Sequence, residues 1–440
     1  MASLPGLNDS LQPVDLGSDL NEPKHVSITA GSEWRVDVPQ DSKLTIKVLS
    51  GIAEIFGTEL ASDVPYVFQG TKFAIYAVED TEFEWVSPEL TGHSISTDTN
   101  MKFVYNLHFA LEKLRVSSFE GPRVLIVGES CTGKTSLAKT LCAYAIKFKA
   151  HQPMMINLNP QECIYSPPGC LTATPVSDVM DVSSSTWGQS MTSGATKLHN
   201  KQPIVKNFGL EQISENKERY VSAFCQLANA VRGRVQNDST VRRSGLIIDT
   251  PSLGQLSDDF SELKEMIYQF KVNAVVVCAK DDTLAIKLNE HLPVETLAIV
   301  RLPISSGVVQ TDDVYKRALQ RNAIREYFYG DFNTVLSPYT LGVDFDMITV
   351  WQPKSVLIQS ESKDELLPVE VNASNLQHAL VAITYASRRS SSEEVSASPI
   401  LGFALVMDVN DTKKKLRVLL PVPGLLPDKA MVLTAYRYLE

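Results

Sequence analysis

Residues 124–135 read VLIVGESCTGKT. The part from Gly128 to Thr135 matches the pattern GxxxxGK[ST] without deviation, follows a short apolar run and precedes a helical pattern over residues 136–147. A strand that feeds a helix through a glycine loop turns successive backbone N–H groups toward one concavity, and the helix N-terminus adds about half a positive charge. Phosphate oxygens fit there, so the sequence predicts a P-loop that binds a nucleoside triphosphate, most simply ATP with Mg²⁺.

Each residue of this loop has an expected role. Lys134 is placed to bridge the β- and γ-phosphates, and Thr135 offers its hydroxyl to Mg²⁺. Asp249 ends the apolar run 246–248 and precedes Thr250 and Pro251, which predicts a Walker B carboxylate beside the metal, although an aspartate that caps a turn before proline would look the same. The predicted nucleotide-binding residues of the loop are Gly128, Glu129, Ser130, Cys131, Thr132, Gly133, Lys134, Thr135 and Ser136.

Further apolar runs predict the domain around this loop. Three further runs consist mainly of Met, Ile, Leu and Val: residues 154–158, 245–249 and 274–277. Such runs are typical of strands in a parallel sheet that is covered on both faces. Helical spacing at residues 100–114 and 262–270 alternates with them. The sequence therefore predicts an α/β, doubly wound central domain.

The flanks predict two other domains. Short alternating runs between residues 26 and 86 are typical of a small antiparallel β-sandwich, with residues 87–100 as its exit and residues 1–22 as a mobile lead-in. Beyond residue 330, short strands such as 347–351 return and predict a mixed, mainly β domain, in which residues 388–398 form a solvated loop. The expected domains are 1–99, 100–325 and 326–440, close to the roughly 150 residues that one core usually organises.

Composition excludes several classes of protein. A hydrophobic fraction of 44% with 21% charged residues is typical of a globular chain. The net charge of −10 argues against a surface built throughout for nucleic acid, but leaves a local basic groove open. The six cysteines form no CxxC pair, which indicates reduced thiols rather than a metal site. Without a signal-like N-terminus or an apolar run of ~18 residues, we expect a soluble, intracellular protein.

Longer segments carry a family resemblance. Together with the P-loop, these are residues 53–60 (AEIFGTEL), 186–189 (TWGQ), 324–330 (IREYFYG) and 398–403 (SPILGF). They resemble the fungal pre-mRNA cleavage factor IA subunits of the polyribonucleotide 5′-hydroxyl-kinase family, the ATP-binding mRNA cleavage and polyadenylation factors, over essentially the whole chain. The resemblance implies a RecA-like P-loop domain between an N-terminal β-sandwich and a C-terminal α/β domain.

The resemblance also implies a ligand arrangement and partners. ATP would be gripped between the first two domains, with Glu33 and Lys72 of the sandwich on the adenine side; by themselves these two residues read as exposed charges on strands. The implied partners are the cleavage factor IA scaffold subunit, which reads the RNA polymerase II C-terminal domain, and other 3′-end processing subunits. The implied location is the nucleus, and direct RNA contact is left open.

Three differences from active members of the family bear on whether the chain is an enzyme. Active kinases of the family resemble Asn-Leu-Asp where this chain has Asn159, and an asparagine cannot accept the proton of an RNA hydroxyl, a loss worth on the order of 10² to 10⁴ in rate. Leu253 stands where a tryptophan stacks an RNA base. In the segment that corresponds to the lid of active kinases, Thr311 and Lys316 stand where paired arginines would contact the transferring phosphoryl group. Arg317 and Arg321 are alternative candidates for these two arginines.

These differences favour an ATP-binding assembly subunit with no catalytic residue over an enzyme. ATP would then be a structural ligand, since a ligand at a thousandfold excess over its dissociation constant stabilises the folded form by ~4 kcal/mol. An active polyribonucleotide 5′-hydroxyl kinase is the alternative, favoured by the intact P-loop. A slow ATPase switch is a third hypothesis.

Overall fold

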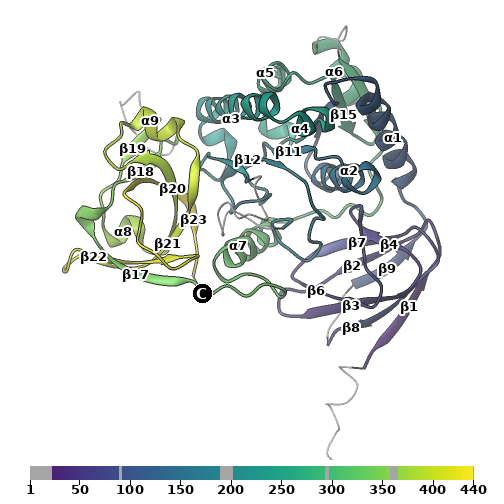
Figure 1. The fold of residues 1–440 in the computed structure, drawn as a ribbon, viewed down its shortest axis with the longest axis horizontal. Coiled ribbons are helices and arrows are strands. Elements are labelled where there is room, and N and C mark those ends of the chain that lie inside the picture. The colour runs from purple at the N-terminus through teal and green to yellow at the C-terminus, as the bar shows by residue number, and fades with distance from the viewer. Residues whose placement is uncertain (1–21, 89–91, 189–201, 293–296, 357–364, 440) are drawn as a thin grey trace, which may run out of the picture. The chain divides into compact units, whose positions relative to one another are not determined.

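The computed structural model describes residues 22–88, 92–188, 202–292, 297–356 and 365–439 (Figure 1). The predicted mobile lead-in falls outside these residues except for Glu22, and so do residues 89–91 of the predicted exit and Gln189 of the TWGQ segment. The chain forms two compact units, residues 1–53 with 60–96 and residues 54–59 with 97–440. The two boundaries between the three predicted domains stay a prediction.

The N-terminal part is the predicted β-sandwich. Its strands alternate buried and exposed residues, and Trp34, Ile46 and Ile75 lie fully buried between the sheets. One sheet has the order β1 (Lys24–Ile28), β8 (Thr81–Val86), β3 (Lys43–Ser50), β6 (Pro65–Gln69). The other has the order β5 (Thr58–Glu59), β4 (Ala53–Ile55), β7 (Lys72–Ala77), β2 (Glu33–Asp37), β9 (Gly92–Ser96).

The central sheet confirms the predicted α/β class and adds three strands to the four that were predicted. Five strands run parallel, and β12 and β13 extend one edge through antiparallel pairings of β11 with β12 and of β12 with β13, so the sheet is mixed. The sequence analysis did not identify β12, β13 or the parallel strand β16. The order is β13 (Ile204–Asn207), β12 (Cys170–Pro175), β11 (Met154–Asn157), β14 (Leu246–Asp249), β10 (Arg123–Gly128), β15 (Ala274–Cys278), β16 (Ala298–Leu302).

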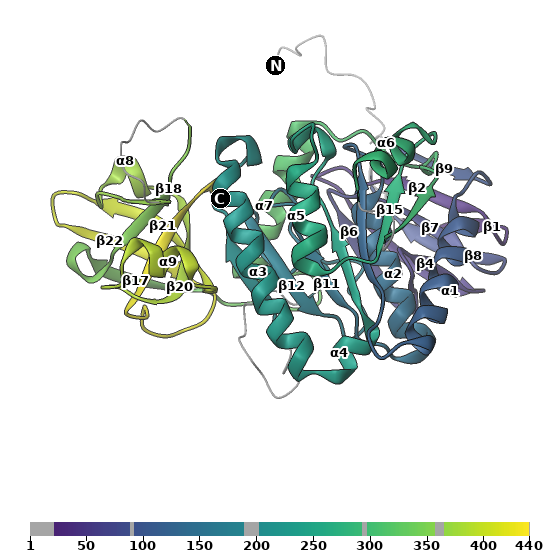
Figure 2. The same cartoon turned by 90° about the horizontal axis from the view of Figure 1, so that it is seen from above.

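Helices cover both faces of this sheet, which explains the unbroken apolar runs. Val124 and Ile126 pack against α1 (Met101–Ser117) and α2 (Lys134–Lys149). Leu125 and Val127 face α3 (Lys217–Asn237), α5 (Ser261–Phe270) and α6 (Thr283–His291) on the other side (Figure 2). The remaining elements of this part are α4 (Ser239–Ser244), α7 (Asp313–Tyr329), and the 3₁₀ turns η2 (Ile213–Glu215) and η3 (Leu253–Gln255).

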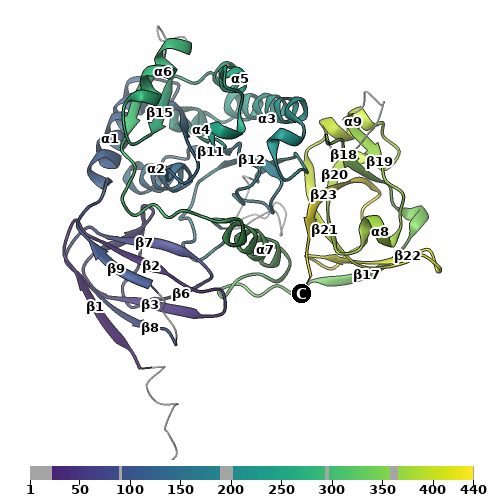
Figure 3. The ribbon, with the colours of Figure 1, turned by 180° about the vertical axis from the view of Figure 1, so that it is seen from behind.

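The C-terminal sheet curves around the short helix α8 (Ala373–Leu376), whose Leu376 is fully buried (Figure 3). Its opposite face packs on α7, where the backbone N–H of Phe403 donates to the Tyr327 hydroxyl at 2.9 Å. The order is β17 (Tyr339–Asp344), β22 (Lys415–Leu420), β21 (Ile400–Asn410), β20 (Ala379–Ser387), β23 (Lys429–Arg437), β18 (Val350–Pro353), β19 (Leu366–Pro368).

Two local predictions in this part were wrong. The segment 388–398 is not only a solvated loop, because it contains helix α9 (Ser392–Ala397), whose Val395 is buried. The Ser391 side chain accepts a bond from the Glu394 N–H at the helix start, a capping arrangement that outweighs the polar composition. The predicted strand 347–351 is divided between the 3₁₀ turn η5 (Phe345–Met347) and β18.

All six cysteines are unpaired thiols. Within the described part of the chain, no helix combines the length and apolarity that a bilayer crossing requires.

Candidate nucleotide site

The P-loop follows β10 in a conformation that glycine permits. Gly128 has φ 159°, and a Cβ there would lie 2.6 Å from the Cys278 carbonyl oxygen. Gly133 has φ 80° at the residue before α2, and Cys131 between them has φ 54°. The left-handed residues turn the chain sharply onto the helix N-terminus, so the loop has the shape that the motif predicted.

Two side chains fold back onto the loop. Lys134 Nζ donates to the Glu129 carbonyl oxygen at 2.6 Å, and Thr132 Oγ1 donates to the same oxygen at 2.9 Å. Lys134 is 7% exposed, which keeps its ammonium beside the loop rather than in solvent. Ser130 is exposed, and Ser136 lies in the first turn of α2, where its carbonyl accepts from Thr140 Oγ1.

The predicted metal residues meet at the carboxyl edge of the sheet. Parallel pairing sets Asp249 beside Ile126 of β10, and Thr135 Oγ1 donates to Asp249 Oδ2 at 2.7 Å. Asp249 is 0% exposed, and its Oδ1 has no hydrogen-bond partner among the described residues. Buried unpartnered carboxylate oxygens are costly, and an oxygen beside a threonine hydroxyl fits Mg²⁺, which takes few protein ligands and several from phosphate and water.

Burial raises the pKa of Asp249 to about 7, although Lys134 and the hydrogen bond from Thr135 pull it down. The neighbouring Glu162 raises it further. A cation at Oδ1 would favour the ionised form of this carboxyl.

Asn159 lies at the same edge, beyond β11, whose Asn157 pairs with Asp249. Its Oδ1 accepts from the Gln161 N–H at 3.2 Å, and its own N–H donates to Asn157 Oδ1 at 2.9 Å. The side chain therefore shapes the turn that follows the strand. It brings no carboxylate to this position.

Glu162 is a site residue that the sequence analysis missed. Burial raises the pKa of its half-buried carboxyl, and the charges of Lys134 and Lys316 oppose that rise. The interactions place a carboxyl near both the P-loop lysine and the start of α7. Its position three residues after Asn159 was the available signal.

The segment before α7 approaches the P-loop. Thr311 contacts Cys131 through its backbone N–H (3.4 Å to Sγ) and its hydroxyl (3.3 Å). A Cβ at Gly133 would lie 3.4 Å from Val308. Burial raises the pKa of the Cys131 thiol, but the bonds from Thr311 and Ser130 and the charge of Lys316 outweigh this, and the pKa falls below its usual value.

The other lid candidates and Leu253 are engaged in different ways. Lys316 pairs with Asp313 at 3.8 Å. Arg321 donates to the Leu439 carbonyl at 2.8 Å and lies over the Tyr438 ring, which directs it to the C-terminal strand. Leu253 is 8% exposed within the core of the central domain, so it presents no surface on which a base could stack.

Glu33 and Lys72 lie on neighbouring strands of the sandwich. Glu33 is 6% exposed and accepts from Arg35 Nε at 3.2 Å, so it is not the exposed strand charge that composition alone suggested. The carboxylate is held inward because Arg35 neutralises it. Lys72 Nζ pairs with Asp37 Oδ2 at 2.8 Å. Their predicted place beside adenine stays a prediction.

Comparison with known proteins covers nearly the whole chain. Residues 27–118 match the N-terminal β-sandwich domain of polyadenylation factor, residues 128–330 the P-loop of mRNA cleavage and polyadenylation factor CLP1, and residues 336–440 the pre-mRNA cleavage complex II protein Clp1. The mRNA cleavage and polyadenylation factor CLP1 of Eremothecium gossypii is 55% identical, with 100% of both chains aligned. The chain belongs to the CLP1 family.

Solved structures of this family share the fold. A complex of wild-type Clp1p with a Pcf11p fragment matches with a TM-score of 0.92 and 54% identity, over 96% of this chain and 99% of the other. A second structure, which concerns an extended Pcf11p–Clp1p interface and ATP loss in a glycine-to-arginine point mutant, matches with a TM-score of 0.91 and 53% identity, over 96% of this chain and 100% of the other. The resemblance predicted from sequence is confirmed at the level of family and fold.

Proposed function

We propose that this chain is an ATP-binding subunit of the mRNA 3′-end cleavage and polyadenylation machinery, and that ATP with Mg²⁺ is a structural ligand rather than a substrate. The observation that carries the proposal is the pairing of Thr135 with the buried Asp249, whose second carboxylate oxygen has no partner among the described residues. A hydroxyl and a carboxylate oxygen placed in this way are suited to bind a cation, and the backbone N–H groups of the adjoining loop are suited to bind phosphate.

The chain's own residues would hold the ligand in a defined order. The loop N–H groups from Gly128 to Gly133 and the α2 N-terminus bind the phosphates, Lys134 neutralises the β- and γ-phosphates, and Thr135 with Asp249 holds Mg²⁺, which would supply charge neutralisation between the phosphates. Glu33 and Lys72 complete the proposed site on the adenine side. The relative structure concerned with ATP loss in a glycine variant supports a nucleotide in this family.

Assembly is the proposed purpose of the bound nucleotide. The solved relatives are complexes with Pcf11p, and we infer a corresponding scaffold subunit as the partner of this chain, together with other 3′-end processing subunits in the nucleus. ATP that binds only the closed arrangement stabilises it by mass action. The three-domain division 1–99, 100–325 and 326–440 is part of the proposal, since ATP would join the first two domains.

The absence of a base at Asn159, of a stacking surface at Leu253 and of charge at Thr311 supports a non-catalytic role. One observation favours the alternative, an active polyribonucleotide 5′-hydroxyl kinase: Glu162 brings a carboxyl with a raised pKa toward Lys134. A base of raised pKa is suited to proton transfer near neutral pH.

A single labelling experiment separates the two functions. The purified chain is incubated with ATP labelled in its γ-phosphate and an RNA that carries a 5′-hydroxyl, beside the Glu162→Gln variant. The assembly role predicts no labelled RNA from either protein. Labelling by the parent chain that Glu162→Gln abolishes would establish the kinase instead.

A further inference from the structure

A second concave site lies at the opposite edge of the central sheet from the P-loop. A partly open cavity of about 120 Å³ lies between α3 and α5, over the first residues of β10 and β14. Arg123 begins β10 and Gly128 ends it, a separation of roughly 16 Å at about 3.3 Å per residue. The cavity is therefore separate from the nucleotide site.

The floor of the cavity is apolar. Ala228, Val231 and Val235 contribute from α3, and Leu246 and Phe270 close it from the sheet and from α5. All five are buried. The volume is close to the roughly 150 Å³ of an engineered cavity that holds benzene, so this one has room for a single aliphatic side chain.

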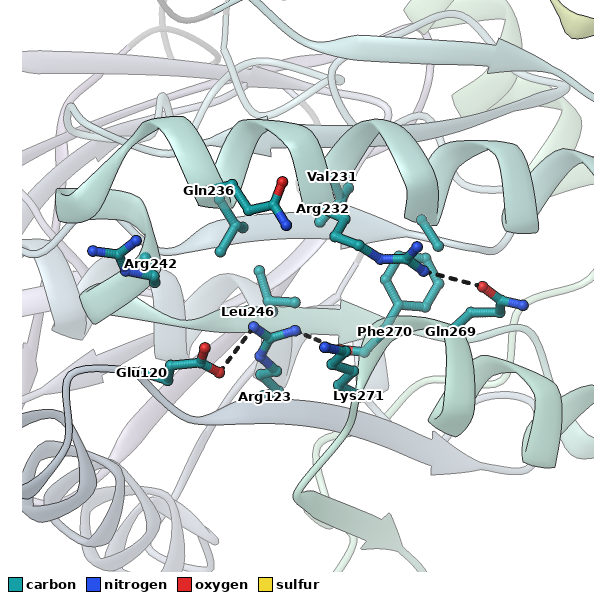
Figure 4. A pocket seen from close by; sticks show the side chains of 12 residues that line it. Glu120, Arg123, Val231, Arg232, Gln236, Arg242, Leu246, Gln269, Phe270 and Lys271 are labelled. Carbon is teal, nitrogen blue, oxygen red and sulfur yellow. Dashed lines mark hydrogen bonds and ion pairs between the residues drawn. The ribbon is translucent and has the colours of Figure 1, made fainter.

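The rim of the cavity is cationic. Four basic side chains surround the floor, those of Arg123, Arg232, Arg242 and Lys271, against the single carboxylate of Glu120 (Figure 4). The local net charge of +3 contrasts with −10 for the whole chain. The sequence analysis left open a local basic groove on a molecule whose net charge is negative, and this cavity is such a basic surface.

Most of this positive charge is not neutralised by the residues that the structure describes. The Arg123 guanidinium already has partners within the chain, since it forms an ion pair with Glu120 at 3.2 Å and donates to the Phe270 carbonyl oxygen. Within the described part of the chain, Arg232 donates only to the neutral Gln269 amide oxygen, at 3.4 Å. For Arg242 and Lys271, the described residues offer no ion pair. Helix C-termini favour cations. This accounts for Arg242 and Lys271 singly, but not for the convergence of charges from three helices on one cavity with an apolar floor.

We propose that this cavity docks an acidic peptide segment of a protein partner, with one aliphatic side chain inserted between α3 and α5. Carboxylates that flank the inserted residue would pair with Arg232, Arg242 and Lys271, a complementarity that favours encounter and register. Single-stranded RNA is disfavoured as occupant because such sites stack bases on exposed aromatic rings, and Phe270 is 1% exposed. The inference goes beyond nucleotide binding and requires none of its steps.

Fluorescence anisotropy of the full chain tests the proposal. The probe is a short fluorescein-labelled peptide of glutamates and aspartates with one central leucine, and a second probe carries glycine in place of leucine. We expect the leucine probe to bind at least tenfold tighter than the glycine probe. The double variant Arg242→Glu/Lys271→Glu should weaken its binding at least tenfold and retain bound nucleotide like the parent. The double variant Arg243→Glu/Lys264→Glu is the matched control, since it makes the same charge change at two residues that do not line the cavity, and should bind like the parent.

A cavity-filling variant, Val235→Phe, adds a test that leaves the charges intact. It should abolish the preference for leucine over glycine while its thermal unfolding stays close to that of the parent. Equal binding of both probes to the parent chain would overturn the proposal, as would equal losses in Arg242→Glu/Lys271→Glu and in the control Arg243→Glu/Lys264→Glu. So would any of three other outcomes: labelled single-stranded RNA that competes with the peptide, binding that appears only after deletion of residues 1–21, or self-association that Arg242→Glu/Lys271→Glu abolishes.

Discussion

Replacement of Asp249 by asparagine should stabilise the nucleotide-free protein. The native pKa of about 7 lies well above the ordinary value of 3.8. Between these values the native carboxyl holds a proton that the unfolded chain has lost, so its contribution to stability falls as pH rises and is lost above the native pKa. At about 1.4 kcal/mol per pKa unit, a shift of about three units corresponds to at most ~4 kcal/mol.

The Asp249→Asn variant lacks this titration but keeps an oxygen that can accept from Thr135. Its advantage in unfolding free energy should therefore grow from near zero at pH 4 toward that limit above pH 7. Urea unfolding of nucleotide-stripped parent and variant from pH 5 to pH 8 measures the difference. The variant should at the same time lose most of the stabilisation that ATP with Mg²⁺ gives the parent, because an amide is a poorer ligand for Mg²⁺ than a carboxylate.

Two results would refute this reasoning. A difference between parent and variant that stays constant from pH 5 to pH 8 would mean that Asp249 does not titrate in this range. A variant that is less stable than the parent at pH 8 would mean that the carboxylate already has a compensating partner in the empty site.

Three further outcomes follow from the same site. Lys134→Ala should weaken ATP binding roughly ten- to a hundredfold in equilibrium titration, since a charge-assisted hydrogen bond contributes ~1.5 to 3 kcal/mol. An unchanged affinity would show that the Lys134 ammonium does not contact the bound nucleotide. Asn159→Asp alone should not confer RNA 5′-phosphorylation, because a base without a substrate clamp is insufficient; labelled RNA would show that the clamp is present. Iodoacetamide should modify Cys131 at a lower pH than an ordinary thiol, and more slowly when ATP is bound. Cys142, whose pKa burial raises to about 12, should stay unmodified. Mass spectrometry measures the modification of both cysteines, and a rate at Cys131 that ATP does not change would contradict the proposed location of the nucleotide.

The parts of this fold that were predictable from sequence are those with local signals. The P-loop motif and the apolar run before it are contiguous, and pairing between parallel strands brings Asp249 to the same edge, as its position after a buried run predicted. The strands β12 and β13 were missed because Cys170–Pro175 mixes threonine and cysteine with few large apolar residues, although all of it is buried. Their burial depends on α3 and the C-terminal sheet, which come later in the chain.

Functional residues outside the motif were harder to predict for the same reason. The environment of Glu162 depends on Lys134 and Lys316, and no spacing rule connects these positions. The basic cavity combines residues near 120, 232, 242 and 271, so only the folded sheet brings them together. Helix α9 could have been found, because Ser391 and Glu394 have the spacing of a capping box.

The nucleotide that the protein carries after purification tests the central claim most directly. The full chain is purified without added nucleotide and denatured, and the released nucleotide is identified by chromatography. The account predicts intact ATP in near-stoichiometric amount that persists through long incubation of the native protein. Release of ADP alone, or of no nucleotide from a folded chain, would contradict it.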